Sequence, residues 1–436
     1  MTVTPWGDAS RLRSLKLPPG PGKGRWAVRQ SQRERLYAAT VAVVAEKGYK
    51  ATRVEDILVM AGVSRNAFYK HFSNKRDCFV ATLEAINDFA VPVIVDAFEQ
   101  TPGRWDRRLA AMLATAAAAL VAQPATARVA WVEVYAGGPE AVAVIERLDC
   151  SVEDIVCRAI EDSPERAGMP REVVRAVTGG VRKIIHRRVR EERIGELPPL
   201  MPELFSWMQS YHRPQEPLRR PRRIPPEFIP SRVEPQDARE RILAAVVELV
   251  AEKGYAETPI TEIAARAAVS LTTFYAHFDG KEEAFLAALA DAERRLFKAT
   301  VAQASTAPDW AISVSVGLCA FFAFLATDPM TAQLGGLRVW ATGAAGLDLR
   351  AQGLSRFSLL LDEGFRQFPD TNPVAAEAIG ATLDALIYSS LRHEGAERLY
   401  EVAPLATFIT LTPFLGTARA CELANSAPGV IGQTTL

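Results

Sequence analysis

The feature that most constrains this chain of 436 residues is an internal repeat. Arg33-Glu34-Arg35 recurs as Arg239-Glu240-Arg241, an offset of 206 residues (239 minus 33), and Ala45–Tyr49 recurs at the same offset as Ala251–Tyr255. Further identities keep this offset, namely Val63-Ser64 with Val269-Ser270, Phe68-Tyr69 with Phe274-Tyr275, His71-Phe72 with His277-Phe278, and Lys75 with Lys281. Because the register holds without a gap, the chain contains two copies of one structural unit.

Charge is divided unevenly between the copies, although the formal net charge of the whole chain is zero. Residues 1–235 hold 36 Lys and Arg against 28 Asp and Glu, which gives +8, and residues 236–436 hold 15 against 23, which gives −8. Only the first half is therefore suited electrostatically to a polyanion.

The apolar pattern predicts packed cores and no membrane span. The longest apolar runs, Gly317–Ala326 and Ala114–Ala122, fall short of the ~18 residues that a transmembrane helix requires. The N-terminus has no apolar stretch followed by a small-residue cleavage site, so we expect a cytoplasmic protein without a membrane partner. The cysteines form no Cys-x-x-Cys pair, which argues against a zinc or redox site. They are Cys78, Cys150, Cys157, Cys319 and Cys421.

Two segments rich in Pro and basic residues lie outside the repeat. Residues 1–29 contain Pro18–Gly22 and six Lys or Arg without helical periodicity, which predicts a flexible basic arm that is either a DNA-tracking tail or a solvated terminus. The second segment, residues 213–235, carries the cluster Arg219–Arg223 among its prolines. It predicts a stiff, solvated linker, which at ~3.1 Å per residue in polyproline II form can cross a domain.

Each copy begins with the pattern of three short helices. Leu36, Ala39, Val43 and Val44 recur with helical spacing, as do their counterparts in the second copy, and Gly48 and Gly254 are placed to end this first helix. We expect Thr52 and Glu55 to form a capping box at the start of the second helix. In the second copy we expect Thr258 as the cap, with Pro259 in the first helical position.

A tight turn then separates the second helix from the third. Ile57 and Ala61 face inward, Gly62 breaks the pattern, and Ser64 caps the third helix, whose Phe68 anchors it from behind. A short helix, a tight turn and a second short helix are the geometry that brings a recognition helix to the major groove of DNA.

The ordered string Gly48-Tyr49, Thr52, Ile57, Ala61–Ser64, Phe68-Tyr69, His71-Phe72 and Lys75 resembles the DNA-binding head of the TetR family of bacterial regulators. The resemblance implies an all-α chain of two tandem TetR-like units, each a three-helix head followed by an all-helical domain that binds a small effector and dimerises. We assign the heads to residues 30–80 and 236–286, the helical domains to 81–212 and 287–422, and a C-terminal tail to 423–436.

Arg65 and Asn66 lie in the first turn of the third helix. There, Arg can form two hydrogen bonds with guanine, and Asn can form two with adenine. Tyr, His and Lys side chains on the same helix are placed to contact phosphates, which fixes docking without specifying sequence. The candidate DNA-contacting residues are Thr52, Arg53, Ser64, Arg65, Asn66, Tyr69, Lys70, His71 and Lys75 in the first head, and Thr258, Ser270, Thr272, Thr273, Tyr275, His277 and Lys281 in the second.

The second head departs from the first in two ways that weaken it. Ala268 replaces the turn glycine, a modest strain if φ is positive there, and Leu271 replaces Arg65. Its window 235–285 holds five Lys and Arg against nine Asp and Glu, whereas 29–79 holds ten against five. Affinity for DNA depends on neutralising its phosphates with Lys and Arg side chains. The second head is therefore expected to bind DNA more weakly than the first.

The domains behind the heads read as Ala-rich helices. The family resemblance implies a mostly apolar effector cavity in them, for which Trp131 and Tyr135, at i and i+4 on one helix face, and Phe321, Phe324, Trp340 and Phe357 are candidate lining residues, each with plain core packing as the competing interpretation. The segments Glu172–Glu192 and Pro373–Glu394 take the place of the family's dimer interface. One chain carrying both can pair internally.

We therefore predict a ligand-responsive repressor that acts on double-stranded DNA as a single-chain pseudo-dimer and reads an asymmetric operator. The alternative is a homodimer that reads DNA through the first head, with the second head degenerate. An enzyme or scaffold is the remaining alternative, but His-Glu-x-x-His, Gly-x-Ser-x-Gly and phosphate-loop motifs are missing from the sequence. We expect no catalytic residue, metal site or cofactor.

Overall fold

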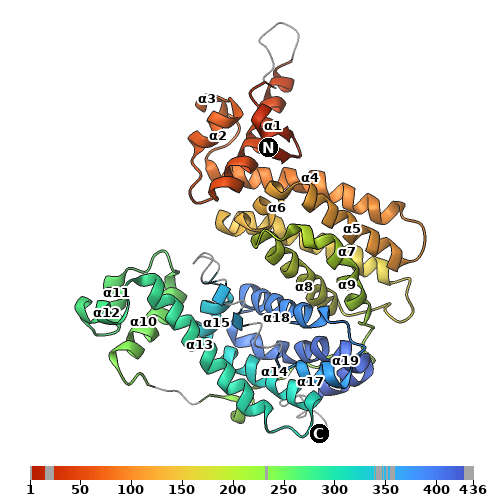
Figure 1. Cartoon of the computed structure of the whole chain (residues 1–436), viewed down its shortest axis with the longest axis vertical. Helices are drawn as coiled ribbons and strands as arrows, with labels where there is room; N and C mark the ends of the chain where they lie inside the picture. The colour runs from red at the N-terminus through yellow and green to blue at the C-terminus, as the bar shows by residue number, and fades with distance from the viewer. Residues whose placement is uncertain are drawn as a thin grey trace. The chain divides into compact units, whose positions relative to one another are not determined.

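The computed structural model describes residues 2–14, 24–230, 234–337, 339, 346, 348–349, 352–353 and 359–426 (Figure 1). These residues are helical apart from connecting segments and one hairpin of two short strands, β1 (Val3–Thr4) and β2 (Gly7–Asp8). The all-α prediction with two tandem units is confirmed. By its contacts the chain divides into Met1–Ala167 with Ile184–Phe205, the first unit, and Gly168–Lys183 with Ser206–Leu436, the second unit.

The first head consists of α1 (Arg25–Lys47), α2 (Val54–Ala61) and α3 (Arg65–Phe68), closed by α4 (Lys75–Gln100). The predicted apolar stripe of α1 is buried, and Leu36 packs with Ile57 and Phe68 in one core. Gly48 and Gly62 have φ of 79° and 61°, a left-handed range that favours glycine. These two turns end α1 and α2 and so set the angle between the three helices.

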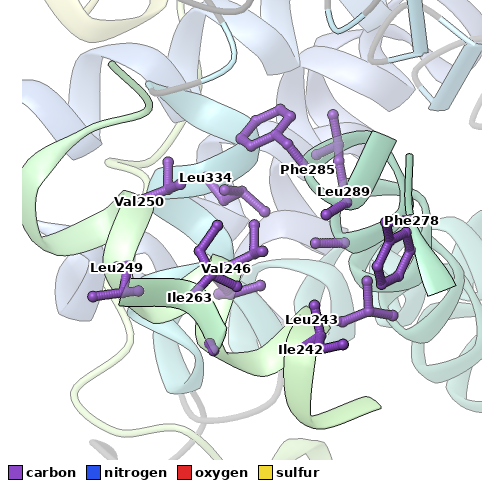
Figure 2. Close-up of a cluster of buried hydrophobic side chains, with 14 of the residues drawn as sticks. Ile242, Leu243, Val246, Leu249, Val250, Ile263, Phe278, Phe285, Leu289 and Leu334 are labelled. Atoms are coloured by element: carbon purple, nitrogen blue, oxygen red, sulfur yellow. The ribbon is translucent and has the colours of Figure 1, made fainter. Parts of the chain in front are cut away.

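The second head repeats this plan with α10 (Ala238–Lys253), α11 (Ile260–Arg266) and α12 (Leu271–His277), closed by α13 (Lys281–Ala304). Figure 2 shows its core, in which Val246 and Phe285 gather with Leu334 of α15 (Pro329–Gly336). Ala268 has φ of 52° at the turn, so the condition under which the missing glycine causes strain is met.

The helix starts differ from the predicted caps. Arg53 is the cap of α2, and its backbone N–H donates to Asp56 over 2.9 Å. Thr52 is buried, and its hydroxyl donates to the carbonyl of Gly48 over 2.8 Å. Thr258 is likewise buried and donates to Gly254 over 2.8 Å, while Pro259 occupies the cap. Both threonines stabilise the turn behind the helix, because their backbone positions precede the cap by one residue.

Helices make up the two domains behind the heads. The first domain contains α5 (Trp105–Ala122), α6 (Pro124–Trp131), η2 (Glu133–Gly137), α7 (Pro139–Ile160), α8 (Arg171–Arg190), η3 (Ile194–Glu196) and α9 (Leu197–Gln209). The described elements of the second are α14 (Trp310–Thr327), α15, α17 (Asp362–Gln367), α18 (Val374–His393), η6 (Ala396–Val402) and α19 (Ala403–Asn425). The unit boundary falls inside α8, so the predicted boundary at residue 212 does not separate the two compact units.

The N-terminal segment is more ordered than the predicted flexible arm. Residues 2–14 fold as the β1–β2 hairpin and η1 (Ala9–Arg11), and Leu12 is buried in the core of the first head. Arg13 donates to the carbonyl of Val59 through two nitrogens, at 2.9 and 2.6 Å. The prediction missed this because it weighed Pro, Gly and charge over the apolar residues Trp6 and Leu12; residues 15–23 lie outside the described residues.

The linker is anchored to the last helix of the second unit, which corrects the solvated spacer of the sequence analysis. Asn425 on α19 accepts the N–H of Arg219 over 2.9 Å and donates to the carbonyl of Pro217 over 3.2 Å. Arg220 lies 3.6 Å from Glu401, and η4 (Pro226–Phe228) buries Phe228. These contacts hold the linker against the helices instead of leaving it free to span a domain.

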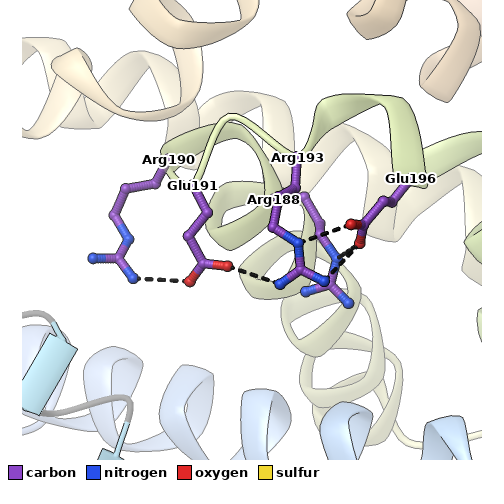
Figure 3. Close-up of polar contacts among 5 residues, drawn as sticks. All are labelled: Arg188, Arg190, Glu191, Arg193 and Glu196. Carbon is purple, nitrogen blue, oxygen red and sulfur yellow. Dashed lines mark hydrogen bonds and ion pairs between the residues drawn. The ribbon is translucent and has the colours of Figure 1, made fainter.

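Acidic side chains neutralise the arginine-rich end of α8. Figure 3 shows Arg193 between Glu191 and Glu196, with Arg188 also on Glu196 and Arg190 on Glu191. Two cations at the end of α8, Arg188 and Arg190, are therefore paired locally with carboxylates that follow the helix.

Among the residues that the structure describes, four helical stretches are long and apolar enough to cross a membrane by length and composition alone, and a fifth counts if the bent pair α5 and α6 is taken together. They are Lys75–Gln100, Trp310–Thr327, Val374–His393 and Ala396–Asn425. The sequence analysis searched for unbroken runs of apolar residues. These helices contain polar residues within their apolar windows, so that search did not find them. In the last three, most of the apolar window is buried inside the protein, so these side chains serve as core.

Candidate DNA-binding surfaces

The recognition helix of the first head presents polar side chains on a buried aromatic base. Ser64 caps α3 by accepting the N–H of Ala67 over 3.2 Å. Phe68 is buried beneath the helix, and its ring packs on Phe72 at 5.6 Å between centroids. Arg65 and Asn66 are left exposed at its first turn, where the sequence analysis placed them.

Arg65 forms an ion pair with Glu55 of α2. Both side chains are more than half exposed, and exposed pairs of this kind contribute at most about 1 kcal/mol. Arg65 can therefore exchange this carboxylate for a guanine edge at small cost. Meanwhile the pair holds the guanidinium near the start of α3.

Further polar groups of the first head surround this turn. Tyr69 is half exposed, and Lys70 and Arg53 are exposed, as phosphate contacts require. His71 is partly buried, and its Nε2 lies 3.1 Å from Oε1 of Gln32. Burial first, and then the charges of Arg33 and Arg29, lower the pKa of His71 below its ordinary value, so the ring is neutral at physiological pH.

The sequence analysis assigned Arg29 to a flexible basic arm, whereas it lies in the first turns of α1. Counting back by the repeat offset, α10 starts at the equivalent of residue 32 (238 minus 206), so α1 is longer by seven residues (32 minus 25). Trp26, Arg29 and Arg33 lie at i, i+3 and i+7, and Trp26 is 77% exposed. Gln32, one residue before Arg33 on α1, contacts His71 just after the recognition helix. The i, i+3, i+7 spacing was the available sequence clue.

Lys75 and Lys281 do not face outward as predicted phosphate contacts. Lys75 Nζ donates to the carbonyls of Tyr49 and Thr52, each over 2.8 Å, and lies 4.3 Å from the centre of the Tyr49 ring. Partial burial lowers the pKa of Lys75. Lys281 repeats this contact on the carbonyl of Tyr255 at 2.8 Å. Each lysine fastens the turn that follows the first helix of its head.

The second recognition helix, α12, is capped in the same manner but carries a different surface. Ser270 accepts the N–H of Thr273 over 3.0 Å, and the two hydroxyls lie 2.8 Å apart. Leu271 and Thr272 are exposed at its first turn. Tyr275 is half exposed, and His277 is exposed. The polar set of the first head is thus partly kept, while its arginine is replaced by an aliphatic side chain.

Two cations of the second head are paired with carboxylates of the same head. Arg266 donates to Glu248 and Glu252 at 3.0 and 3.1 Å, and these hydrogen bonds raise its pKa and lower the pKa of Glu252. Lys253 forms an ion pair with Glu262. These pairs leave the net charge of the head unchanged, but they occupy two of the five cations counted in its window.

Each head is also tied to its own helical domain. In the first unit, Glu133 of η2 accepts the backbone N–H of Tyr49 over 2.8 Å, and Arg128 lies 3.7 Å from Glu133. In the second unit, Leu334 and Val339 belong to the core of the head itself. In the first unit the contact reaches the turn after α1, and in the second it reaches the core of the head.

The predicted ligand-lining aromatic residues are spread over several elements. Trp131 ends α6, whereas Tyr135 lies in η2, so the two do not share one helix face as predicted. Tyr135 packs edge-on against His186 at 5.5 Å. Phe324 is buried within α14, Phe321 is half-buried, and Trp340 and Phe357 lie outside the described residues. An open groove of about 450 Å³ in the second unit is lined by other residues, including Leu286, Ala290 and Leu349.

Both heads match a known family of bacterial regulators. The family described as bacterial regulatory proteins, tetR family, matches residues 36–82 and 242–288, which are the two heads. The chain is 32% identical over 106 residues to the HTH-type transcriptional activator FasR of Mycolicibacterium smegmatis. This match covers 24% of the chain and about half, 48%, of that relative.

The solved structures that the chain matches include two bacterial regulators. The fatty acid degradation regulator FadR of Bacillus halodurans is 21% identical, with a TM-score of 0.37 and coverage of 42% of this chain and 97% of that chain. FadR of Bacillus subtilis, solved in complex with stearoyl-CoA, is 17% identical, with a TM-score of 0.37 and coverage of 40% and 96%. The matching family and the FasR relative are transcription regulators and not enzymes, in agreement with the sequence analysis. Two separate stretches of the chain, one in each head, therefore match the DNA-binding domain of the tetR family.

Proposed function

We propose that this protein is a ligand-responsive repressor that binds an asymmetric operator as a single-chain pseudo-dimer. The observation that supports this proposal is the presence in one chain of two helix-turn-helix heads with unlike first turns, Arg65-Asn66 in one and Leu271-Thr272 in the other. Dimeric proteins of this type read two half-sites about 34 Å apart, one turn of DNA. Unlike heads in one chain require unlike half-sites.

The first head supplies most of the affinity in this proposal. Arg65 leaves Glu55 to donate to guanine, and Asn66 pairs with adenine. Arg53, Tyr69 and Lys70 contact phosphates around the major groove. The exposed first turns of α1, with Trp26 and Arg29, extend the contact along the backbone.

The second head contributes to sequence selectivity mainly through its shape and its apolar contacts. Leu271 and Thr272 can pack on the methyl group of thymine, and Tyr275 can donate to a phosphate. Because Lys253 and Arg266 are already paired, this head releases fewer counterions and depends less on salt.

A small, mostly apolar effector binds in the helical domains and alters the separation of the heads. It releases the operator only if it binds the released geometry more tightly than the DNA-bound one. Glu133 in the first unit and Leu334 in the second are the contacts through which such a change reaches the heads.

The site of action is DNA in the cytoplasm, and the output we propose is repression by occupation of a promoter. The relative FasR is named an activator. Whether this protein represses or activates transcription therefore needs a direct test. A reporter fused to the operator gives higher expression when the gene is deleted if the protein represses, and lower expression if it activates.

The first experiment is a footprint on the promoter region of the gene itself at low salt, followed by a mass measurement of the complex. We expect protection of two unequal half-sites and one chain per operator. Two chains per operator, or no protection, overturns the pseudo-dimer proposal.

A second candidate function is a homodimer that reads DNA only through its first heads. The paired cations of the second head, Arg266 above all, favour it. Under this alternative, Arg65→Ala with Asn66→Ala abolishes binding, whereas Thr272→Ala with Thr273→Ala leaves it unchanged. Under the pseudo-dimer proposal both variants lose affinity.

A further inference from the structure

The first half of α8 and the whole of α18 lie in the same compact unit and pack closely. A Cβ atom at Gly180 would collide with the hydroxyl of Thr382 and lie 3.2 Å from the carbonyl of Ala378. A Cβ at Gly179 would lie 3.1 Å from that of Ala385. Two adjacent glycines on α8 thus let a helix of the first repeat approach a helix of the second at backbone distance.

A buried ion pair lies beside this approach. Lys183 Nζ is 3.0 Å from Oδ2 of Asp384, and each side chain is only 7% exposed. The same ammonium lies 4.7 Å from the centre of the Tyr388 ring. Removing one partner of such a buried pair is strongly destabilising, because the other charge is left in a low-dielectric interior.

We propose that this contact selects its partner: it makes the first repeat pair with the second and prevents either repeat from pairing with its own kind in another chain. The proposal rests on the pseudo-dimer described above and adds the residues that enforce it. A buried polar pair that fixes pairing is a known use of an interaction that contributes little net stability.

Pairing of α8 with a second α8 fails on charge. Counting from the first residue of each helix, Asp384 is ten residues after Val374, and Val181 is ten residues after Arg171. In the same geometry, an α8–α8 pair therefore places Lys183 opposite Val181 of the other copy. The ammonium is then buried without the carboxylate that Asp384 supplies.

Pairing of α18 with a second α18 fails on shape as well as charge. By the same count, Gly180 and Leu383 are each nine residues after the start of their helices. An α18–α18 pair therefore puts Leu383 where only glycine fits against Thr382. It also places Asp384 opposite Leu386, twelve residues after Val374, in place of Lys183.

A charge exchange in the full chain tests this proposal. Lys183→Glu alone and Asp384→Lys alone each bury two like charges, and we expect Tm to fall by about 6 to 15 °C in each. The double variant K183E/D384K restores the pair within one chain. We expect its Tm to recover most of the loss and its mass in solution to stay at one chain, 47.6 kDa.

Mixing the two single variants gives the sharpest measurement. The carboxylate introduced at position 183 of one chain then complements the ammonium introduced at position 384 of the other, and the unaltered Lys183 and Asp384 complement each other as well. We expect complexes of two chains in the mixture, detected by native mass measurement, and none in either variant alone. A double variant no more stable than the singles, or a mixture without complexes, overturns the proposal. Neither result depends on DNA binding, so both leave the proposed function open. Two wild-type chains on one operator would reject the pseudo-dimer itself.

Discussion

The carboxylate of Glu133 accepts the backbone N–H of Tyr49 at 2.8 Å, although the two residues are 84 positions apart in the chain. Tyr49 follows the glycine that ends α1, and its carbonyl also accepts from Lys75. One peptide turn is therefore held from the domain side by Glu133 and from the head side by Lys75. This turn is the most direct polar connection described between the first head and the helices behind it.

Replacing Glu133 with Ala should lower the free energy of unfolding by about 1–3 kcal/mol, because the N–H of a largely buried residue loses its acceptor. Glu133→Gln keeps an acceptor at the same place and should cost clearly less. Urea denaturation followed by circular dichroism measures both. Equal losses in the two variants would show that the charge of Glu133, and not this hydrogen bond, stabilises the turn.

Lys70 and Lys75 should separate DNA affinity from stability. Lys75→Ala removes a cation from two carbonyls and should reduce stability by about 1.5–3 kcal/mol, while the salt dependence of DNA binding stays the same. Lys70→Ala should leave stability unchanged and lower the slope of log affinity against log salt by about one. Titrations at several salt concentrations, with thermal melts of the same samples, make the comparison. If Lys75→Ala changes the slope of log affinity against log salt, Lys75 contacts a phosphate after all.

The turn of each helix-turn-helix offers a reciprocal pair of substitutions. Ala268 has φ of 52°, where a Cβ is strained, so Ala268→Gly should stabilise the second head by up to about 1 kcal/mol. Gly62→Ala should destabilise the first head by about 1 kcal/mol or more, because a Cβ there also meets Cγ of Arg13 at 3.2 Å. Melting curves of the two variants test the signs. A loss of stability in Ala268→Gly would mean that another contact of that alanine outweighs the backbone strain.

Periodicity and turn chemistry were enough to predict the helices and the two turns, since these depend on residues near each other in sequence. The roles of Lys75 and Thr52 were not predictable in this way. Lys75 was assigned to the recognition helix, whereas it begins α4, and its ammonium is bound by carbonyls 23 and 26 residues earlier, which only the folded head brings together. Similarly, Lys183 reads as one of several charges on α8 until α18 brings Asp384 beside it.

His71 provides a test of the remaining predicted phosphate contact through pH. Its pKa is lowered in the free protein by burial and by Arg33 and Arg29, so the unfolded chain binds the proton more readily than the folded one. Stability from this residue is therefore full above the unfolded pKa of about 6.5 and declines as pH falls below it. A phosphate beside the ring reverses the preference and favours the protonated form.

We therefore expect operator affinity, relative to His71→Gln, to rise as pH is lowered from 7.5 to 5.5, while the stability of the free protein falls relative to the same variant. Fluorescence anisotropy titrations and urea melts at each pH give the two trends. His277→Gln is the matched control in the second head, where the ring is exposed. If affinity follows pH equally in wild type and His71→Gln, the ring does not touch a phosphate, and its bond to Gln32 serves only to hold α1 against the recognition helix.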